Sequence, residues 1–177
     1  MKKTITLSII ALLAGGLLVA KINEYPQGVY PPSGWGVTNP SITQENIKDN
    51  ICNPSWSTSS IRPTSSYTTA LKISQIKSMG YKDTNPSHYE EDHVISLELG
   101  GDPKSHQNLY PQPYEVYFNK VRIGAHEKDK VENFLHKEVC NGDITLAQAQ
   151  KDITTNWVEI YSKISNQSVP LSSTDDY

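Results

Sequence analysis

The segment from Tyr89 to Pro111 constrains the fold of this chain more than any other part of the sequence. Residues 91–97, Glu-Asp-His-Val-Ile-Ser-Leu, are the best strand candidate. The run Gly100-Gly101-Asp102-Pro103 is a strong turn signal, and a second short strand fits at 108–110. Together these signals predict a small antiparallel hairpin.

Helical patterns surround this hairpin. Three stretches have apolar residues at helical spacing, at about 67–79, 125–140 and 146–162. Ser66 can cap the first helix and Gly80 can end it. Because few residues are left for strands, the sequence predicts an α+β fold that is mostly helical, with a small β-hairpin core and additional flanking helices.

The hairpin carries residues suited to metal-assisted hydrolysis. The Asp92 carboxylate is a hard oxygen ligand for a divalent ion. The His93 imidazole, which titrates near neutrality, can take a proton from water. The carbonyl oxygen of Asn108 is a second hard ligand that the turn would bring back. Adjacent residues of a strand point to opposite faces, so Asp92 and His93 can serve one site only if the strand ends or twists there.

The N-terminus predicts export. A basic start, Met1-Lys2-Lys3, precedes a run from Leu7 to Ala20 that is apolar or small apart from one serine. The run of about 14 residues is shorter than the roughly 20 that span a bilayer. We therefore expect residues 1–20 to be a cleaved signal peptide, with an uncleaved anchor as the alternative, and the mature protein to be periplasmic or secreted with no stable membrane association.

The remaining chain is predicted to hold one domain. Residues 21–45 are rich in Pro and Gly and are interpreted as an extended leader, residues 46–163 as the folded domain, and residues 164–177 as a disordered tail. In an oxidising compartment the two cysteines, Cys52 and Cys140, are expected to form a disulfide. Two buried thiols are the alternative.

The charge balance limits how the protein can bind a partner. Sixteen Lys and Arg oppose nineteen Asp and Glu, for a net charge of −3. No basic tail or acidic block is present, which argues against binding of nucleic acid or anionic lipid by bulk electrostatics. A local basic groove stays compatible with this balance.

The ordered set of motifs resembles the HNH nucleases, whose core is the ββα-metal motif, and in particular the exported bacterial branch of that superfamily. The resemblance extends over about 39–162. It rests on Asn39-Pro40, Ile51-Cys52, Trp56, Arg62-Pro63, Glu91-Asp92-His93, Leu97-Glu98-Leu99-Gly100-Gly101, Asn108 to Pro113, Ala125 to Asp129, Glu132, Val139 to Gly142 and Ala149-Gln150 with Trp157.

This resemblance implies a phosphodiesterase. His93 would be the general base that activates water, and Asp92 would bind one divalent ion beneath the scissile phosphate. The ion would be Mg²⁺ by preference, with Mn²⁺ and Zn²⁺ as alternatives. Asn108 matches the middle Asn of the motif, where it would either bind the metal or orient the base.

The third element of the motif departs from the usual pattern, because the helix lacks the expected cysteines. His126 in the first helical turn is the favoured third ligand, with Asp129 and Glu132 as alternatives. Lys128 could hold the phosphate. Arg62 is either a helix-entry anchor or a phosphate contact, and Glu91 either belongs to a solvated face, orients His93 or binds a nearby water.

Two functions follow from the sequence. The first is an exported metal-dependent endonuclease acting on DNA, with RNA as a second substrate and with little sequence preference, because no recognition module is evident. The second is a non-catalytic envelope or interaction domain that keeps the same scaffold.

Overall fold

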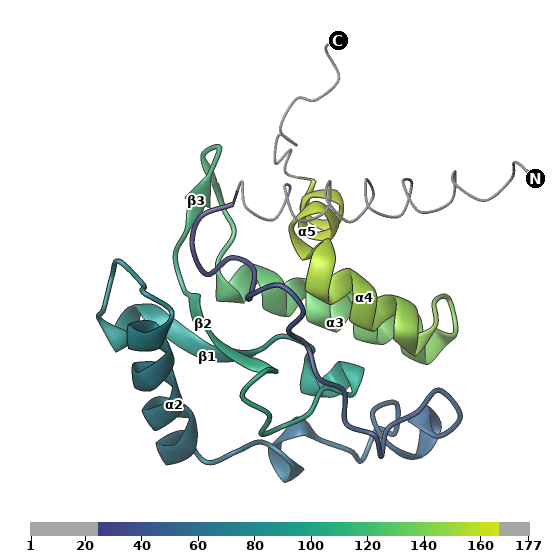
Figure 1. Ribbon diagram of the computed structural model, residues 1–177. Helices are drawn as coiled ribbons and strands as arrows, with labels where there is room; N and C mark the ends of the chain where they lie inside the picture. The colour runs from purple at the N-terminus through teal and green to yellow at the C-terminus, as the bar shows by residue number, and fades with distance from the viewer. Residues whose placement is uncertain (1–24, 167–177) are drawn as a thin grey trace, which may run out of the picture.

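The computed structural model of the chain describes residues 25–166 (Figure 1). The expected signal peptide and residues 167–177 of the expected tail lie outside this range. Within it are four α-helices, Ser65–Ser78 (α2), Ala125–Asn141 (α3), Leu146–Thr155 (α4) and Trp157–Ser165 (α5), and two small antiparallel sheets. The α+β class expected from the sequence is confirmed.

The central sheet is the predicted hairpin, with shifted boundaries. Strand β1 (Tyr89–His93) pairs with β2 (Leu109–Pro113), and His93 lies opposite Leu109. The expectation that the strand continues to residue 97 is wrong, because Leu97–Leu99 forms a 3-10 helix. Gly101 explains the tight return of the chain, since a Cβ there would lie 1.8 Å from the Ile95 carbonyl oxygen.

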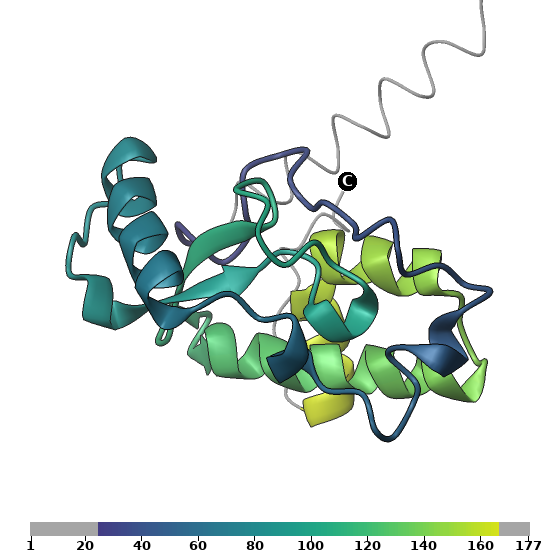
Figure 2. The same cartoon turned by 90° about the horizontal axis from the view of Figure 1, so that it is seen from below.

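The hairpin lies between two helical layers (Figures 1 and 2). On one side α2 packs against both strands, and a small apolar cluster of Ile76, Tyr81 and Tyr89 fills this contact. On the other side α3, α4 and α5 pack together around the main core, which includes the fully buried Trp157. The main core therefore lies among α3, α4 and α5, and α3 is also the helix whose Lys128 reaches the end of β1.

The segment before residue 46 contributes to this core, although the sequence suggests a surface leader. Its backbone is largely irregular, but Val29, Tyr30 and Ile42 are buried in the main apolar cluster. The indole Nε1 of Trp157 donates a hydrogen bond to the Val29 carbonyl oxygen at 3.1 Å. The described part of this segment is thus packed onto the folded unit.

Three further differences concern element boundaries. The first helix begins after Thr64 rather than Ser66, and Gly80 follows it in the left-handed conformation. The predicted helix at 146–162 is divided into α4 and α5 at Asn156, whose φ of −134° leaves the helical region. Residues 117–122 form a second hairpin that the sequence pattern did not indicate, with strands Tyr117–Phe118 (β3) and Val121–Arg122 (β4).

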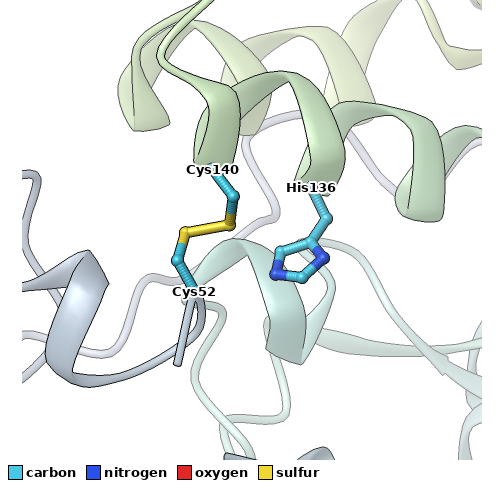
Figure 3. A group of neighbouring side chains, drawn as sticks. All are labelled: Cys52, His136 and Cys140. Carbon is cyan, nitrogen blue, oxygen red and sulfur yellow. A yellow bond between two sulfur atoms is a disulfide. The ribbon is translucent and has the colours of Figure 1, made fainter. Parts of the chain in front are cut away.

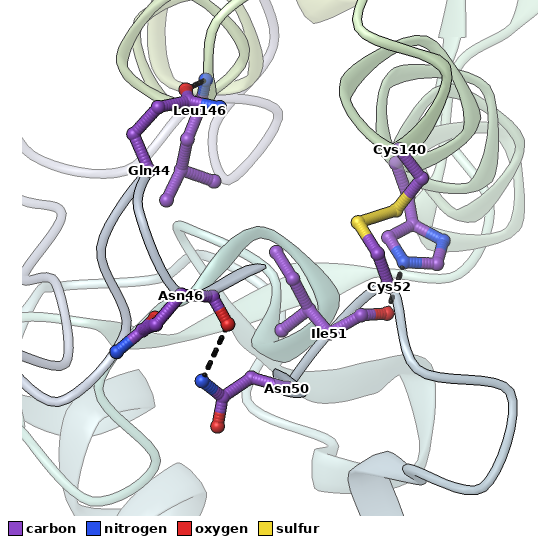
Figure 4. The surroundings of a disulfide bond; sticks show 8 residues. Gln44, Asn46, Asn50, Ile51, Cys52, Cys140 and Leu146 are labelled. Atoms are coloured by element: carbon purple, nitrogen blue, oxygen red, sulfur yellow. Dashed lines mark hydrogen bonds between the residues drawn. A yellow bond between two sulfur atoms is a disulfide. The ribbon is translucent and has the colours of Figure 1, made fainter. Parts of the chain in front are cut away.

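The predicted disulfide is present. Cys52 and Cys140 are bonded, with their Cα atoms 5.4 Å apart and 88 positions between them in the sequence (Figure 4). The bond joins the loop after the 3-10 helix Ile47–Asp49 to the last turn of α3. Among residues 25–166, no helix is both long enough and apolar enough to cross a membrane.

Candidate functional site

His93 ends strand β1 and is held with its ring in one orientation. The side chain is buried, and its Nε2 lies 3.2 Å from the Pro103 carbonyl oxygen. Because a carbonyl oxygen only accepts hydrogen bonds, Nε2 carries the proton in this contact and Nδ1 is the ring's proton acceptor. Burial lowers the pKa of His93 more than the neighbouring Asp92 charge raises it. The ring is therefore neutral at pH 7, as a general base must be.

Asn108 has a role other than the two that the resemblance implies. Its side chain is fully buried, and its amide is engaged by the backbone. The Oδ1 atom accepts from the N–H groups of Val37 and Ile95, and Nδ2 donates to the carbonyl oxygens of Ile95 and Asp102. The amide thus braces the loop that carries Pro103, and Asn108 also holds the chain just after His93, because its carbonyl oxygen accepts from the Val94 N–H at 2.9 Å.

Lys128 lies in the interior, and this does not fit the expected phosphate contact. Its ammonium group donates to Asp92 Oδ2 at 2.7 Å, to the His93 carbonyl oxygen at 2.8 Å and to Glu132 Oε1. All three donors are used and the residue is 1% exposed. Burial alone would lower the pKa of Lys128, but the charges of Asp92 and Glu132 together raise it by more, so the pKa lies above its ordinary value. Lys128 is the central cation of a buried Asp92–Lys128–Glu132 triad.

Asp92 and Glu132 are the carboxyl members of this triad. Burial raises the pKa of Glu132 more than the Lys128 charge lowers it. Asp92 is anchored twice, because its Oδ1 also accepts from the His93 N–H at 2.8 Å. Both residues belong to β1, and the contacts that join His93 to Asp92 and Lys128 are made by its backbone N–H and carbonyl groups. The structure thus brings Asp92, His93, Lys128 and Glu132 together.

Two further carboxylates, Glu90 and Asp129, lie within electrostatic reach of Asp92. The pKa of Glu90 is raised to about 7 by burial and by the charges of Asp92 and Asp129. Burial and the charge of Asp92 also raise the pKa of Asp129. The three carboxylates are therefore close enough to affect one another, with Lys128 as a neighbouring cation that partly offsets their charges.

The expected ligand set of Asp92, Asn108 and His126 is not brought together. The amide of Asn108 is occupied, and the exposed His126 lies 3.7 Å from Asp129 Oδ2 and against the Tyr114 ring. In the described part of the chain, no group of three His, Cys, Asp or Glu donors within 4.8 Å of one another includes Asp92 or His126. Glu90 and Asp129 offer oxygen donors of the kind that Mg²⁺ or Mn²⁺ prefers, but both oxygens of Asp92 already accept hydrogen bonds, from the His93 N–H and from Lys128.

Arg62 faces this region. It is exposed, and its positive charge partly offsets the burial that raises the pKa values of Glu90 and Glu98. Its charge also adds to the burial that lowers the pKa of His93. Glu98, for which the sequence indicated no role, also belongs to this electrostatic cluster.

Glu91 lies on the opposite face of β1 from Asp92. It is 9% exposed, and among residues 25–166 neither of its carboxylate oxygens has a hydrogen-bond partner. Burial raises its pKa to about 8. Its burial excludes the solvated-face interpretation, and no hydrogen bond links its carboxylate to His93.

A separate group of donor atoms lies at the far end of α3. Cys52, His136 and Cys140 each offer one ligand atom, and these atoms lie within 4.8 Å of one another, so the group could hold a metal ion (Figure 3). The two sulfur atoms are bonded to each other here, and only a thiolate is a strong zinc ligand. The disulfide and a metal ion are therefore mutually exclusive at this position.

Comparisons of this chain with protein-family models, curated proteins and solved structures found no match. The geometry of the site is therefore the basis for the proposed function.

Proposed function

We propose that this protein is an exported, metal-dependent endonuclease that hydrolyses phosphodiester bonds, with DNA as the preferred substrate. The observation that carries the proposal is His93: a buried, neutral imidazole at a strand end, with one nitrogen anchored on Pro103 and the other available as a base, beside three carboxylates and Arg62. A base, a cation site and a phosphate contact are the groups that phosphodiester hydrolysis needs.

The proposed mechanism assigns one task to each group. Nδ1 of His93 takes a proton from a water molecule, whose oxygen attacks the phosphorus in line with the leaving 3′ oxygen. The Arg62 guanidinium contacts a non-bridging phosphate oxygen. A divalent cation, when bound, would neutralise the charge that develops on the phosphate, and Glu90 and Asp129 are the carboxylates left to hold it, because both Asp92 oxygens accept hydrogen bonds. Lys128 keeps Asp92 in place from behind.

The hairpin and α3 also support a ββα-metal type of core. The two strands run antiparallel. The ammonium group of Lys128, in the first turns of α3, donates hydrogen bonds to the Asp92 carboxylate and to the His93 carbonyl oxygen. This arrangement is the support for the HNH-like interpretation. The dispersed donors favour the alternative of a non-catalytic domain, because no compact ligand group surrounds Asp92 in the described residues.

A plasmid-nicking assay tests the proposal. Mature, disulfide-bonded protein should nick supercoiled DNA in Mg²⁺ or Mn²⁺, and a chelator should abolish the reaction. His93→Ala should lower the rate by about 10²- to 10⁴-fold, as expected for loss of a general base. His88→Ala is the matched control, because His88 is exposed and pairs only with neighbouring Asp83 and Asn85.

The outcomes separate the two functions. Undiminished nicking by folded His93→Ala would refute the assigned base. Failure of the folded wild type to cleave DNA or RNA with any divalent metal would favour the non-catalytic domain. The rate should also rise with pH and level off below the ordinary His pKa of about 6.5, because burial lowers the pKa of His93.

A further inference from the structure

The group at the end of α3 combines two helical ligands with one from a loop. His136 and Cys140 are four residues apart on α3, so both side chains lie on the same face of the helix. Cys52 approaches from the loop after Ile47–Asp49, and its neighbour Ile51 accepts a 2.7 Å hydrogen bond from His136 Nε2 (Figures 3 and 4). The backbone thus already presents an imidazole and two sulfur atoms to one point.

We propose that reduction of the Cys52–Cys140 disulfide converts this group into a binding site for one zinc-type divalent cation, held by Cys52, Cys140 and His136. Two thiolates and one imidazole form a ligand set that zinc prefers over harder cations. In a tetrahedral zinc site two sulfur atoms lie about 3.8 Å apart, given Zn–S bonds of about 2.3 Å. Cα atoms 5.4 Å apart allow this separation by side-chain rotation.

The surroundings leave a fourth coordination position open. A cavity of about 420 Å³ borders the group, and Cys52, Cys140, His136 and Glu98 are among its lining residues. One carboxylate oxygen of Glu98 is buried and has no hydrogen-bond partner within residues 25–166. Glu98 and His136 line the same cavity, so the two side chains face a common space. Water from this cavity can complete the shell, with the Glu98 carboxylate as its acceptor.

The conversion balances as a two-electron reduction followed by metal exchange. A dithiol reductant attacks the disulfide, and the S–S bond breaks as the reductant forms its own disulfide. Two cysteine thiols result. On binding, the cation displaces both thiol protons, which pass to solvent, so binding weakens as the pH falls. The bound cation would then connect the 47–58 loop to α3, as the disulfide does in the oxidised protein.

Cobalt and zinc binding to the mature chain test this site. The protein is reduced with a phosphine, which becomes the phosphine oxide and does not compete for the metal through thiols. Co²⁺ added to the reduced wild type should give thiolate-to-cobalt charge transfer and tetrahedral ligand-field bands, and one equivalent of Zn²⁺ should bleach them. The oxidised wild type should give neither. Zn²⁺ should raise the Tm of the reduced protein and leave that of the oxidised protein unchanged.

Two variants decide whether His136 is a ligand. His136→Ala should weaken zinc binding by the reduced protein at least about tenfold, measured by competition with a chromophoric chelator. His106→Ala is the control, because His106 is an exposed histidine that contacts Tyr67 instead, and it should bind as the wild type does. The proposal is overturned if reduced wild type, folded or unfolded, shows no thiolate–cobalt band, or if His136→Ala binds zinc as tightly as wild type.

Discussion

Replacing Lys128 with methionine tests whether this residue is a structural cation or a substrate contact. The substitution keeps the length and apolar stem of the side chain but removes the ammonium group. Asp92 and Glu132, which are 7% and 8% exposed, then lose their shared partner, and the His93 carbonyl oxygen loses a donor. Removing one partner of a buried ion pair costs about 3–5 kcal/mol, because the remaining charge is left without compensation.

The size of the effect can be measured by urea and thermal unfolding of the oxidised protein at pH 7. We expect a loss of about 3–5 kcal/mol in the free energy of unfolding, which corresponds to roughly 6–20 °C in Tm for a domain of this size. Lys130→Met is the matched control, because Lys130 lies on the same helix with its side chain 57% exposed and 3.7 Å from Glu127. Its loss should cost no more than about 1 kcal/mol.

A second substitution, at Glu132, tests whether the loss of stability comes from carboxylates left without a partner. In the Lys128→Met background, Glu132→Gln removes one of the two uncompensated carboxylates and should recover about 1–2 kcal/mol, whereas the same change in the wild type should destabilise the protein. The burial argument is refuted if Lys128→Met costs no more than Lys130→Met. It also fails if the effects of Lys128→Met and Glu132→Gln on the free energy of unfolding are additive. A variant of unchanged stability that binds DNA more weakly would instead restore Lys128 as a phosphate contact.

Two further predictions concern the opposite face of β1 and the disulfide. The folded-state pKa of Glu91 lies above its unfolded value, so burying the carboxyl group costs nothing below about pH 4 and costs more as the pH rises toward 8. Glu91→Gln should therefore stabilise the protein by up to about 4 kcal/mol at pH 8 and by almost nothing at pH 4. Urea titrations that give the same gain in stability at both pH values would contradict this. Replacing Cys52 and Cys140 together by serine should lower the free energy of unfolding by about 4–5 kcal/mol, because the bond closes a loop of 88 positions in the unfolded chain. A loss below about 1 kcal/mol would show that closing this loop does not stabilise the protein.

Much of the fold could be predicted because its signals are local. The Gly100-Gly101 turn and the helical periodicity placed the hairpin and most of the helices within a few residues. The hairpin of β3 and β4 was missed because its turn lacks glycine, although Asn119 and Lys120 both have positive φ values, 49° and 70°. The end of β1 at His93 was missed because the apolar residues that follow form a 3-10 helix at Leu97–Leu99, which the alternation of the strand pattern does not indicate.

The site was less predictable, since residue type does not reveal burial. Asp92 and His93 were selected from their chemistry and from the resemblance, and the sequence treated Lys128 as an accessible cation. A signal was nevertheless present, because Lys128 and Glu132 occupy the same helix face as the buried Leu135 and Val139, at spacings of three, four and seven residues. Oppositely charged residues within an apolar stripe predict a buried ion pair. No comparable local pattern indicates that Arg62 faces His93.

The Lys128 triad also explains why folding and orientation of the candidate base are linked. The backbone N–H of His93 donates to Asp92, its carbonyl oxygen accepts from Lys128, and its ring is anchored on Pro103 in the loop that Asn108 braces. Three separate segments thus fix one residue. Lys128 secures the first turns of α3 to β1, and Cys140 secures the last turn to the loop at Cys52. A helix held at both ends cannot shift along the hairpin, so the Lys128 contacts that dock α3 also fix the backbone of His93, the proposed base.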